Sequence, residues 1–230
     1  MNTVCHHIRK TASKAIVLLT VLCAVFAMSS CDEHEAIDSN IYPGHIMLAD
    51  GSVISPEAYD ASRHQAVAVF FAQKTDKHEA LAVMLRESPA KAVSDTALVK
   101  MGTDLGTSGS ETAYDGYENT IALQAKRSPI ATDAFTSHYL AMSDYVPSVS
   151  EMGLMFLSLP VVNPVLDVLG GDTIAVNDPD CWYWTSTEVS GNKGYQAWAC
   201  SMSDGSRHKA PVYNTYHTRY IVEYNPLSVK

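Results

Sequence analysis

The chain is short of positive charge and of closely spaced cysteines, and each shortage excludes a class of protein. Sixteen Lys and Arg stand against 25 Asp and Glu, which gives a formal net charge of -9. Such a chain is poorly suited to neutralise a phosphate backbone, so we expect no nucleic-acid partner. None of the five cysteines forms a C-x-x-C pair, which argues against zinc-ribbon and thioredoxin-type sites.

Motifs for catalysis and metal binding are also missing. The nearest approach to a serine nucleophile elbow, residues 106–109, lacks the G-x-S-x-G spacing. The glycine-rich segment 102–110 has no Gly-Lys-Ser/Thr ending, so we interpret it as a flexible connection rather than a phosphate loop. No histidine lies in H-x-H or H-E-x-x-H spacing, and the oxygen-rich segment 177–180 is typical of an ordinary turn, with calcium as an open alternative. We therefore expect no enzyme activity, no cofactor, and no catalytic or metal-binding residue.

The N-terminus carries the most informative pattern. Residues 1–30 contain three basic residues and no acidic one, followed by an apolar run over 15–28 that is shorter than the roughly 20 residues needed to span a bilayer. The sequence Met-Ser-Ser-Cys then resembles a bacterial lipoprotein processing site, which predicts cleavage of a signal peptide and acylation, including palmitate, of Cys31. Cys23 is the competing candidate, but bulky Leu22 precedes it.

After Cys31 we expect an acidic tether over residues 31–43 and a single domain over 44–230. Loss of the three basic residues of the signal peptide changes the formal charge from -9 to -12. The run Asp-Glu-His-Glu at 32–35 resembles the signal that sends lipoproteins of Bacteroides-like bacteria to the cell exterior, and a solvated spacer is the alternative. These features predict a protein held in the outer membrane by acyl chains, and facing outward.

Hydrophobic patterning predicts an α+β fold with a mainly antiparallel sheet and two to four helices in the middle of the chain. A hairpin is expected around Asp50–Gly51. Ser148 and Glu151 have capping-box spacing and begin a helix with one apolar face, which Pro160 and Pro164 interrupt. The other expected elements are strands at 66–71, 80–85, 182–187, 195–202 and 218–224 and helices from 115 to 126 and from 128 onward.

Four segments occur in the order typical of the Lcl C-terminal domain family, which the chain resembles over roughly residues 44–224. They are YVPSVSEMGLMF at 145–156, YWTSTE at 183–188, AWACSMSDGS at 197–206 and TRYIVEY at 218–224. The resemblance implies a C-type-lectin-like fold, a surface or secreted protein and an adhesin-like role, and it implies no catalytic residues.

Cys181 and Cys200 lie at equal distances from a point between Ser190 and Gly191. A symmetric hairpin centred there places them directly opposite each other, with Tyr183 opposite Trp198. Cross-strand neighbours come close to disulfide reach, and the cell envelope is oxidising, so a bridge is one outcome and two buried free thiols are the other.

Aromatic residues gather in the C-terminal third of the chain. We interpret Trp184 and Trp198 as core residues. Polar side chains and tyrosines in the segments around them form the candidate ligand-binding set, because tyrosine is favoured at interfaces. Its members are Tyr195, Arg207, His208, Tyr213, Tyr216 and His217.

The sequence thus predicts a non-enzymatic, surface-exposed lipoprotein that binds a glycan or a protein ligand. The alternative is a structural or assembly subunit of an envelope complex that faces the periplasm.

Overall fold

A computed structural model describes residues 40–94, 100, 102–136 and 143–225, all of which belong to one compact unit. Two α-helices lie in it, α2 (Gly116–Ala125) and α3 (Val149–Val168), together with two 3₁₀ turns, η1 (Pro56–Ala58) and η2 (Pro129–Ala131). The strands are β1 (Ile46–Leu48), β2 (Val53–Ile54), β3 (Ala66–Ala72), β4 (Ala80–Met84), β5 (Ser88–Lys91), β6 (Asp144–Tyr145), β7 (Trp182–Glu188), β8 (Gln196–Ser201), β9 (Arg207–Pro211), β10 (Tyr216–Thr218) and β11 (Ile221–Tyr224).

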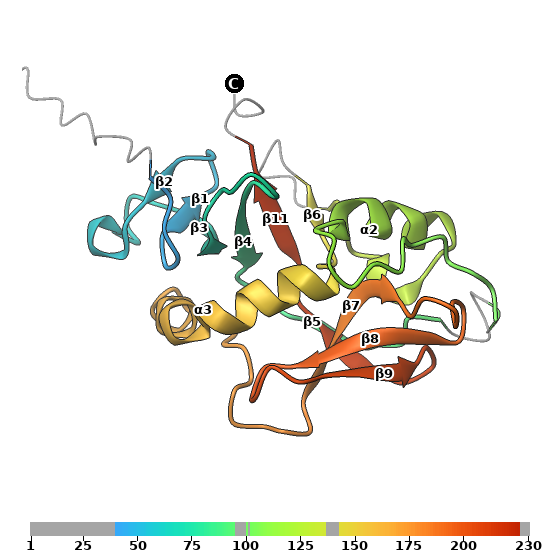
Figure 1. Ribbon diagram of the computed structural model, residues 1–230. Helices are drawn as coiled ribbons and strands as arrows, with labels where there is room; N and C mark the ends of the chain where they lie inside the picture. The colour runs from blue at the N-terminus through green and yellow to red at the C-terminus, as the bar shows by residue number, and fades with distance from the viewer. Residues whose placement is uncertain (1–39, 95–99, 101, 137–142, 226–230) are drawn as a thin grey trace, which may run out of the picture. The chain divides into compact units, whose positions relative to one another are not determined.

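The strands form two sheets, which confirms the predicted α+β class. The first sheet has the order β2-β1-β3-β4-β11-β6 and the second β5-β10-β7-β8-β9. Neighbouring strands run antiparallel, except that β10 and β7 are parallel. Helix α3 packs against β3 of the first sheet and against β7 and β8 of the second (Figure 1). The largest hydrophobic core therefore lies where α3 meets both sheets.

Helix α3 begins with the predicted capping box. The Ser148 N–H donates to Glu151 Oε2 at 2.6 Å, and the Ser148 hydroxyl oxygen accepts the Glu151 N–H at 3.4 Å. The predicted break at Pro160 and Pro164 is wrong, because the helix continues to Val168. Each proline removes one backbone donor, and the helix bends along its length instead of ending, so that its C-terminal half is seen end-on in Figure 1. Both prolines are exposed.

Other local predictions are confirmed. β1 and β2 pair around the Asp50–Gly51 turn, where Gly51 adopts a φ of +83°. Helix α2 fills the predicted segment between Asp115 and Lys126. The expected helix from Ser128 is only the short turn η2. The expected strand 218–224 is divided into β10 and β11, which belong to different sheets.

The predicted register of the β7–β8 hairpin is wrong by two residues. Tyr183, not Cys181, lies opposite Cys200, and it does not face Trp198. Both cysteines are free in the structure, and burial raises the pKa of the Cys200 thiol to about 12. A protonated, buried thiol is a core side chain rather than a reactive one.

The displacement has two local causes. The Val189 N–H donates to the Gln196 carbonyl at 2.9 Å, so the loop closes over residues 190–195 and is centred later than a symmetric hairpin about Ser190 and Gly191. The register then shifts again between Trp184 and Glu188, where β7 bulges.

The glycine-rich segment 102–110 is not a flexible connection, which corrects our interpretation. The buried Glu188 carboxylate accepts the Leu105 N–H at 3.2 Å, the Thr107 N–H at 3.3 Å and the Thr107 hydroxyl at 3.0 Å. It also accepts the Gly194 N–H at 2.7 Å. One carboxylate thus fixes the segment to the β7–β8 loop.

Candidate functional site

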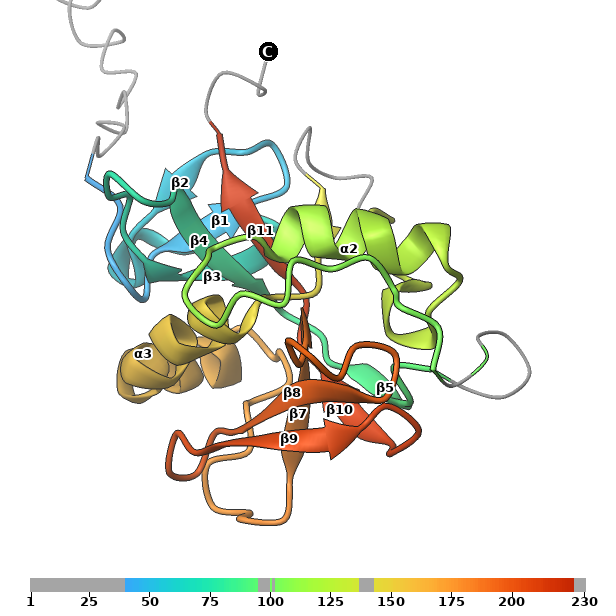
Figure 2. The same cartoon turned by 45° about the vertical axis from the view of Figure 1, so that its right-hand side comes forward.

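Two of the predicted ligand-binding residues lie together on the second sheet, beside a tryptophan. His208 of β9 packs against both Trp182 of β7 and Tyr216 of β10, and we call these three side chains the Trp182–His208–Tyr216 patch. Figure 2 shows the strands that carry them in the second sheet. All three side chains are half-buried, so each keeps part of its surface for a ligand.

The rings of the patch hold one another in place. Trp182 and His208 have ring centroids 3.9 Å apart at an interplanar angle of 77°, and His208 meets Tyr216 edge-on at 5.9 Å. The Asn214 side-chain amide donates to the Tyr216 hydroxyl oxygen at 2.9 Å, and this oxygen lies 3.3 Å from His208 Nε2. The Tyr216 hydroxyl thus links the Asn214 amide to the His208 ring, and the tautomer of His208 decides which of the two groups, hydroxyl or imidazole, is the donor.

Small residues beneath the rings make room for the patch. Ser201 lies opposite Trp182, and Ala199 lies between Trp184 and His208 on the neighbouring strands. Trp184 is completely buried, and its indole N–H donates to the Lys91 carbonyl at 2.9 Å. The Trp184 ring packs on the Tyr216 ring with centroids 4.7 Å apart, and this contact holds Tyr216 in its place in the patch. The core interpretation of Trp184 is thus confirmed, and Trp198, also buried, confirms the second one.

Burial sets the charge state of the patch. Desolvation lowers the pKa of the His208 imidazole below its ordinary value of 6.5. At neutral pH this histidine is therefore an uncharged hydrogen-bonding group. A surface of aromatic edges with neutral donors and acceptors suits a polar, uncharged ligand better than a phosphate or a carboxylate.

The other predicted residues lie elsewhere. Tyr195 and Tyr213 are exposed, at 52% and 59%, in the loops next to β8 and β9, and the Tyr195 hydroxyl lies close to Gly102. Arg207 reaches the opposite face of the second sheet, where its guanidinium lies over Gly153 of α3.

Arg207 lines a groove of about 550 Å³ beside α3, together with Lys77, Glu111 and Tyr114. His217 instead approaches Glu87, with Nδ1 2.5 Å from Oε1. The structure therefore brings together two of the six predicted residues and separates the other four from them.

Arg219 adds a buried charge between the sheets. Its Nη2 donates to the Met84 carbonyl at 3.1 Å and to the Asp172 carbonyl at 2.7 Å, and its Nη1 lies 4.0 Å from Glu87 Oε2. The side chain is completely buried, and every bond named here holds chain segments together. We interpret Arg219 as a structural residue.

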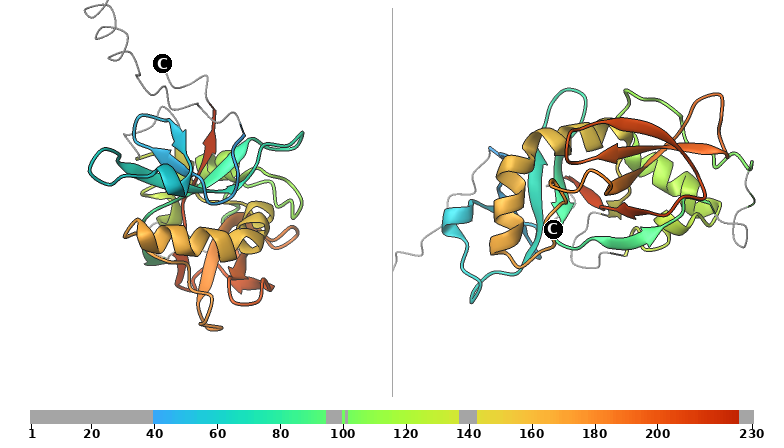
Figure 3. Two further views of the ribbon diagram at one scale, coloured as in Figure 1. Left: turned by 90° about the vertical axis from the view of Figure 1, so that its left-hand side faces the viewer. Right: turned by 90° about the horizontal axis from the view of Figure 1, so that it is seen from below.

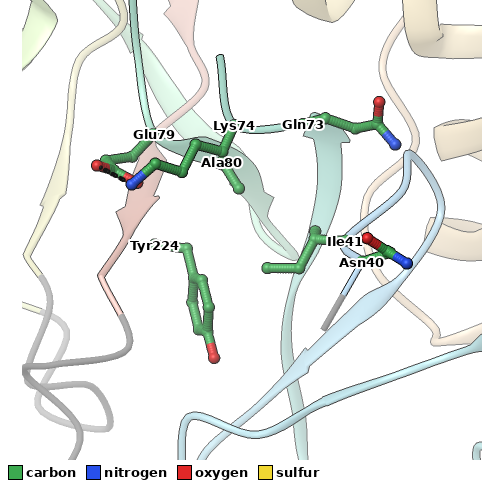
Figure 4. Close-up of a pocket in the computed structure, with 7 residues that line it drawn as sticks. All are labelled: Asn40, Ile41, Gln73, Lys74, Glu79, Ala80 and Tyr224. Atoms are coloured by element: carbon green, nitrogen blue, oxygen red, sulfur yellow. Dashed lines mark hydrogen bonds and ion pairs between the residues drawn. The ribbon is translucent and has the colours of Figure 1, made fainter. Parts of the chain in front are cut away.

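A second hollow, of about 340 Å³, lies on the first sheet beside β11 (Figure 4). Its charged groups, Lys74 and Glu79, are paired at 2.6 Å. The Tyr224 hydroxyl donates to the Gly51 carbonyl at 3.3 Å, and its ring packs on Phe70. These polar groups already have partners within the chain, so the hollow is a weaker candidate than the patch.

Sequence reasoning missed Trp182 and Asn214 as members of the site. Trp182 begins an expected strand without a further signal of its own, and Asn214 belongs to no motif. The alternation of side chains along β7 and β10 was the available signal, because it places Trp182 and Tyr216 on the face opposite Tyr183 and His217.

Within the described residues, no three His, Cys, Asp or Glu side chains come together as a metal site would require. One described helix, α3, is long and apolar enough to cross a membrane, but its inner face belongs to the largest core. The predicted acylation site Cys31 and the signal peptide lie outside the described residues.

The chain was compared with family models, with curated proteins and with solved structures, and none of them matches.

Proposed function

We propose that this protein is a non-enzymatic lipoprotein of the outer membrane that binds a glycan or protein ligand through the Trp182–His208–Tyr216 patch. The observation that carries the proposal is the meeting of three half-buried rings, from three strands, with neutral hydrogen-bonding atoms between them. Sugar rings have apolar faces and many hydroxyls, so an uncharged aromatic and amide surface matches them, and a glycan is the first ligand to test.

The proposed anchor is the acylated Cys31, with the domain facing the cell exterior. Its support is the basic and apolar N-terminal segment, the small residues before Cys31 and the acidic run at 32–35. The proposed finer fold is C-type-lectin-like, on the resemblance to the Lcl C-terminal domain family. Two antiparallel-rich sheets around α3 are compatible with that proposal.

Binding is tested with the purified protein on an array of immobilised glycans. The variant W182A removes the indole ring that packs on His208, and Y216F removes only the hydroxyl between Asn214 and His208. We expect about ten-fold weaker binding for W182A, since truncation of an aromatic residue in a binding site typically costs more than 1 kcal/mol, and about five-fold weaker binding for Y216F, since loss of a hydrogen bond costs about 1 kcal/mol. The matched control Y42F changes an exposed tyrosine before the first sheet and leaves binding unchanged.

Two results contradict the proposal. Glycan binding that survives both patch variants places the ligand elsewhere. Absence of glycan binding, together with a stoichiometric envelope protein that co-purifies in mild detergent, favours the assembly-subunit alternative.

Orientation is tested on intact cells with a protease and a C-terminal epitope tag. Loss of the tag before lysis supports outward exposure, provided that a periplasmic marker survives. Persistence of the tag, when the purified protein is cleaved under the same conditions, overturns it.

A further inference from the structure

The outer face of α3 is apolar although it faces solvent. Leu157 is 74% exposed, Val161 49% and Val168 80%, while Pro160 and Pro164 are exposed between them. We call these five residues the α3 outer stripe. Their spacing of three to four residues keeps them on one side of the helix, opposite the core.

Charge is absent from most of this helix. The sequence from Met152 to Leu166 contains no Asp, Glu, Lys or Arg, and Asp167 is the first charged residue after Glu151. The surface helix of a soluble domain normally has a charged outer face. An apolar stripe next to solvent therefore indicates a partner that is itself apolar.

An apolar recess borders the stripe and enlarges it. Its volume is about 480 Å³, and its walls include Phe156 of α3, Val176 and Met202. Asn163 also lines it, but both ends of its side-chain amide are bonded to Ile174. Stripe and recess together offer a continuous apolar surface along α3.

The N-terminal segment enters the domain beside the stripe. Gly44 lies against Val161 and Val165, so close that a Cβ at position 44 would lie 2.8 Å from Val161 Cγ1. The proposed acylation site Cys31 precedes Gly44 by 13 residues, and an extended chain of that length reaches at most about 45 Å. A bilayer that holds the acyl chains is thus within reach of α3.

From these observations we propose that the α3 outer stripe rests on the lipid bilayer, with the C-terminal half of α3 lying along the membrane surface. The inference depends on the proposed acylation of Cys31. The inner face of α3 is packed in the core, so the helix lies on the bilayer and does not cross it. A zwitterionic surface suits it best, because the chain carries excess negative charge. The left view of Figure 3 shows the C-terminal half of α3 extended across the side that would meet the membrane.

This orientation agrees with the proposed binding site. Tyr183 and Cys200 face α3 from the second sheet, and the neighbouring residues Trp182 and Ala199 point to the other face. With α3 on the membrane, the patch faces away from it.

The test uses the full acylated protein reconstituted in phosphatidylcholine vesicles with and without brominated acyl chains. Tryptophan is introduced at the stripe in L157W and V168W and, as a control, at an exposed loop in Y213W. Brominated lipid quenches only indoles near the acyl chains. We expect the added fluorescence of L157W and V168W to be at least two-fold lower in brominated than in unbrominated vesicles. The added fluorescence of Y213W should be the same in both.

Flotation of the vesicles separates the two proposals. If the protein floats and L157W and V168W are not quenched, the anchor stands and the bilayer contact is overturned. If sedimentation in detergent then shows a dimer that L157E dissociates, a second copy covers the stripe. If neither the protein nor labelled palmitate is found with the vesicles, the anchor and the contact are both overturned.

Discussion

The buried carboxyl group of Glu151 makes the stability of this protein depend on pH. Burial raises its pKa from the ordinary 4.5 to about 7, and hydrogen bonds from Ser148 and from the Tyr145 hydroxyl only partly oppose the effect. The folded state therefore binds the proton more tightly than the unfolded state. The stabilisation that comes from this bound proton is therefore complete below pH 4.5, and it is lost as the pH rises through 7.

The magnitude follows from the difference of about 2.5 pKa units. At about 1.4 kcal/mol for each unit, ionisation of Glu151 lowers the free energy of unfolding by about 3 kcal/mol between pH 4.5 and well above pH 7. The variant E151Q cannot ionise, so it removes this dependence. We expect the unfolding free energy of the wild type, measured relative to that of E151Q, to fall most steeply between pH 5 and 7.

The assay is urea unfolding of the purified protein, followed by tryptophan fluorescence at several pH values from 4.5 to 8. The control E118Q alters an exposed carboxylate in the first turn of α2 and should keep the wild-type profile. If the difference in unfolding free energy between wild type and E151Q stays constant within about 0.5 kcal/mol over this range, burial does not govern this carboxyl group and the reasoning is refuted.

Two further predictions concern buried polar residues that bind distant segments. E188Q replaces an acceptor oxygen with a donor amide opposite backbone N–H groups. We therefore expect the free energy of unfolding in urea to fall by about 2 kcal/mol and the Gly194 amide to exchange its hydrogen faster. Unchanged exchange at Gly194 would contradict the role of Glu188. R219M leaves the Met84 and Asp172 carbonyls without their donor, and we expect the free energy of unfolding to fall by about 3 kcal/mol. R219K should lose less than R219M but stay below the wild type, because lysine lacks the planar guanidinium fork. Wild-type stability in R219M would show that these bonds contribute nothing net.

Local features of the fold could be predicted from sequence because neighbouring residues determine them. The capping box at Ser148 and Glu151 and the turn at Asp50–Gly51 each involve a few adjacent residues. Features that depend on distant segments could not be predicted. β5 contains Pro89 and would not be recognised as a strand, but it is an edge strand that forms by pairing with β10.

The candidate site was only half predictable for the same reason. His208 and Tyr216 were chosen for their chemistry, and both belong to the patch. Arg207 and His217 have equally suitable chemistry, but adjacent residues of a strand point to opposite faces, so each lies behind its neighbour. Which face carries the site depends on the packing of α3, which no local pattern reveals.

The last described strands complete both sheets, and this has a consequence for biogenesis. β10 lies between β5 and β7, β11 lies between β4 and β6, and only Arg219 and Tyr220 separate the two strands in the chain. Until this segment has been synthesised, each sheet has a gap in its interior. We therefore expect both sheets to be completed late in folding, through contacts of long sequence separation. A premature stop codon before Tyr216 would then interrupt both sheets at once, separating β6 from β4 and β5 from β7.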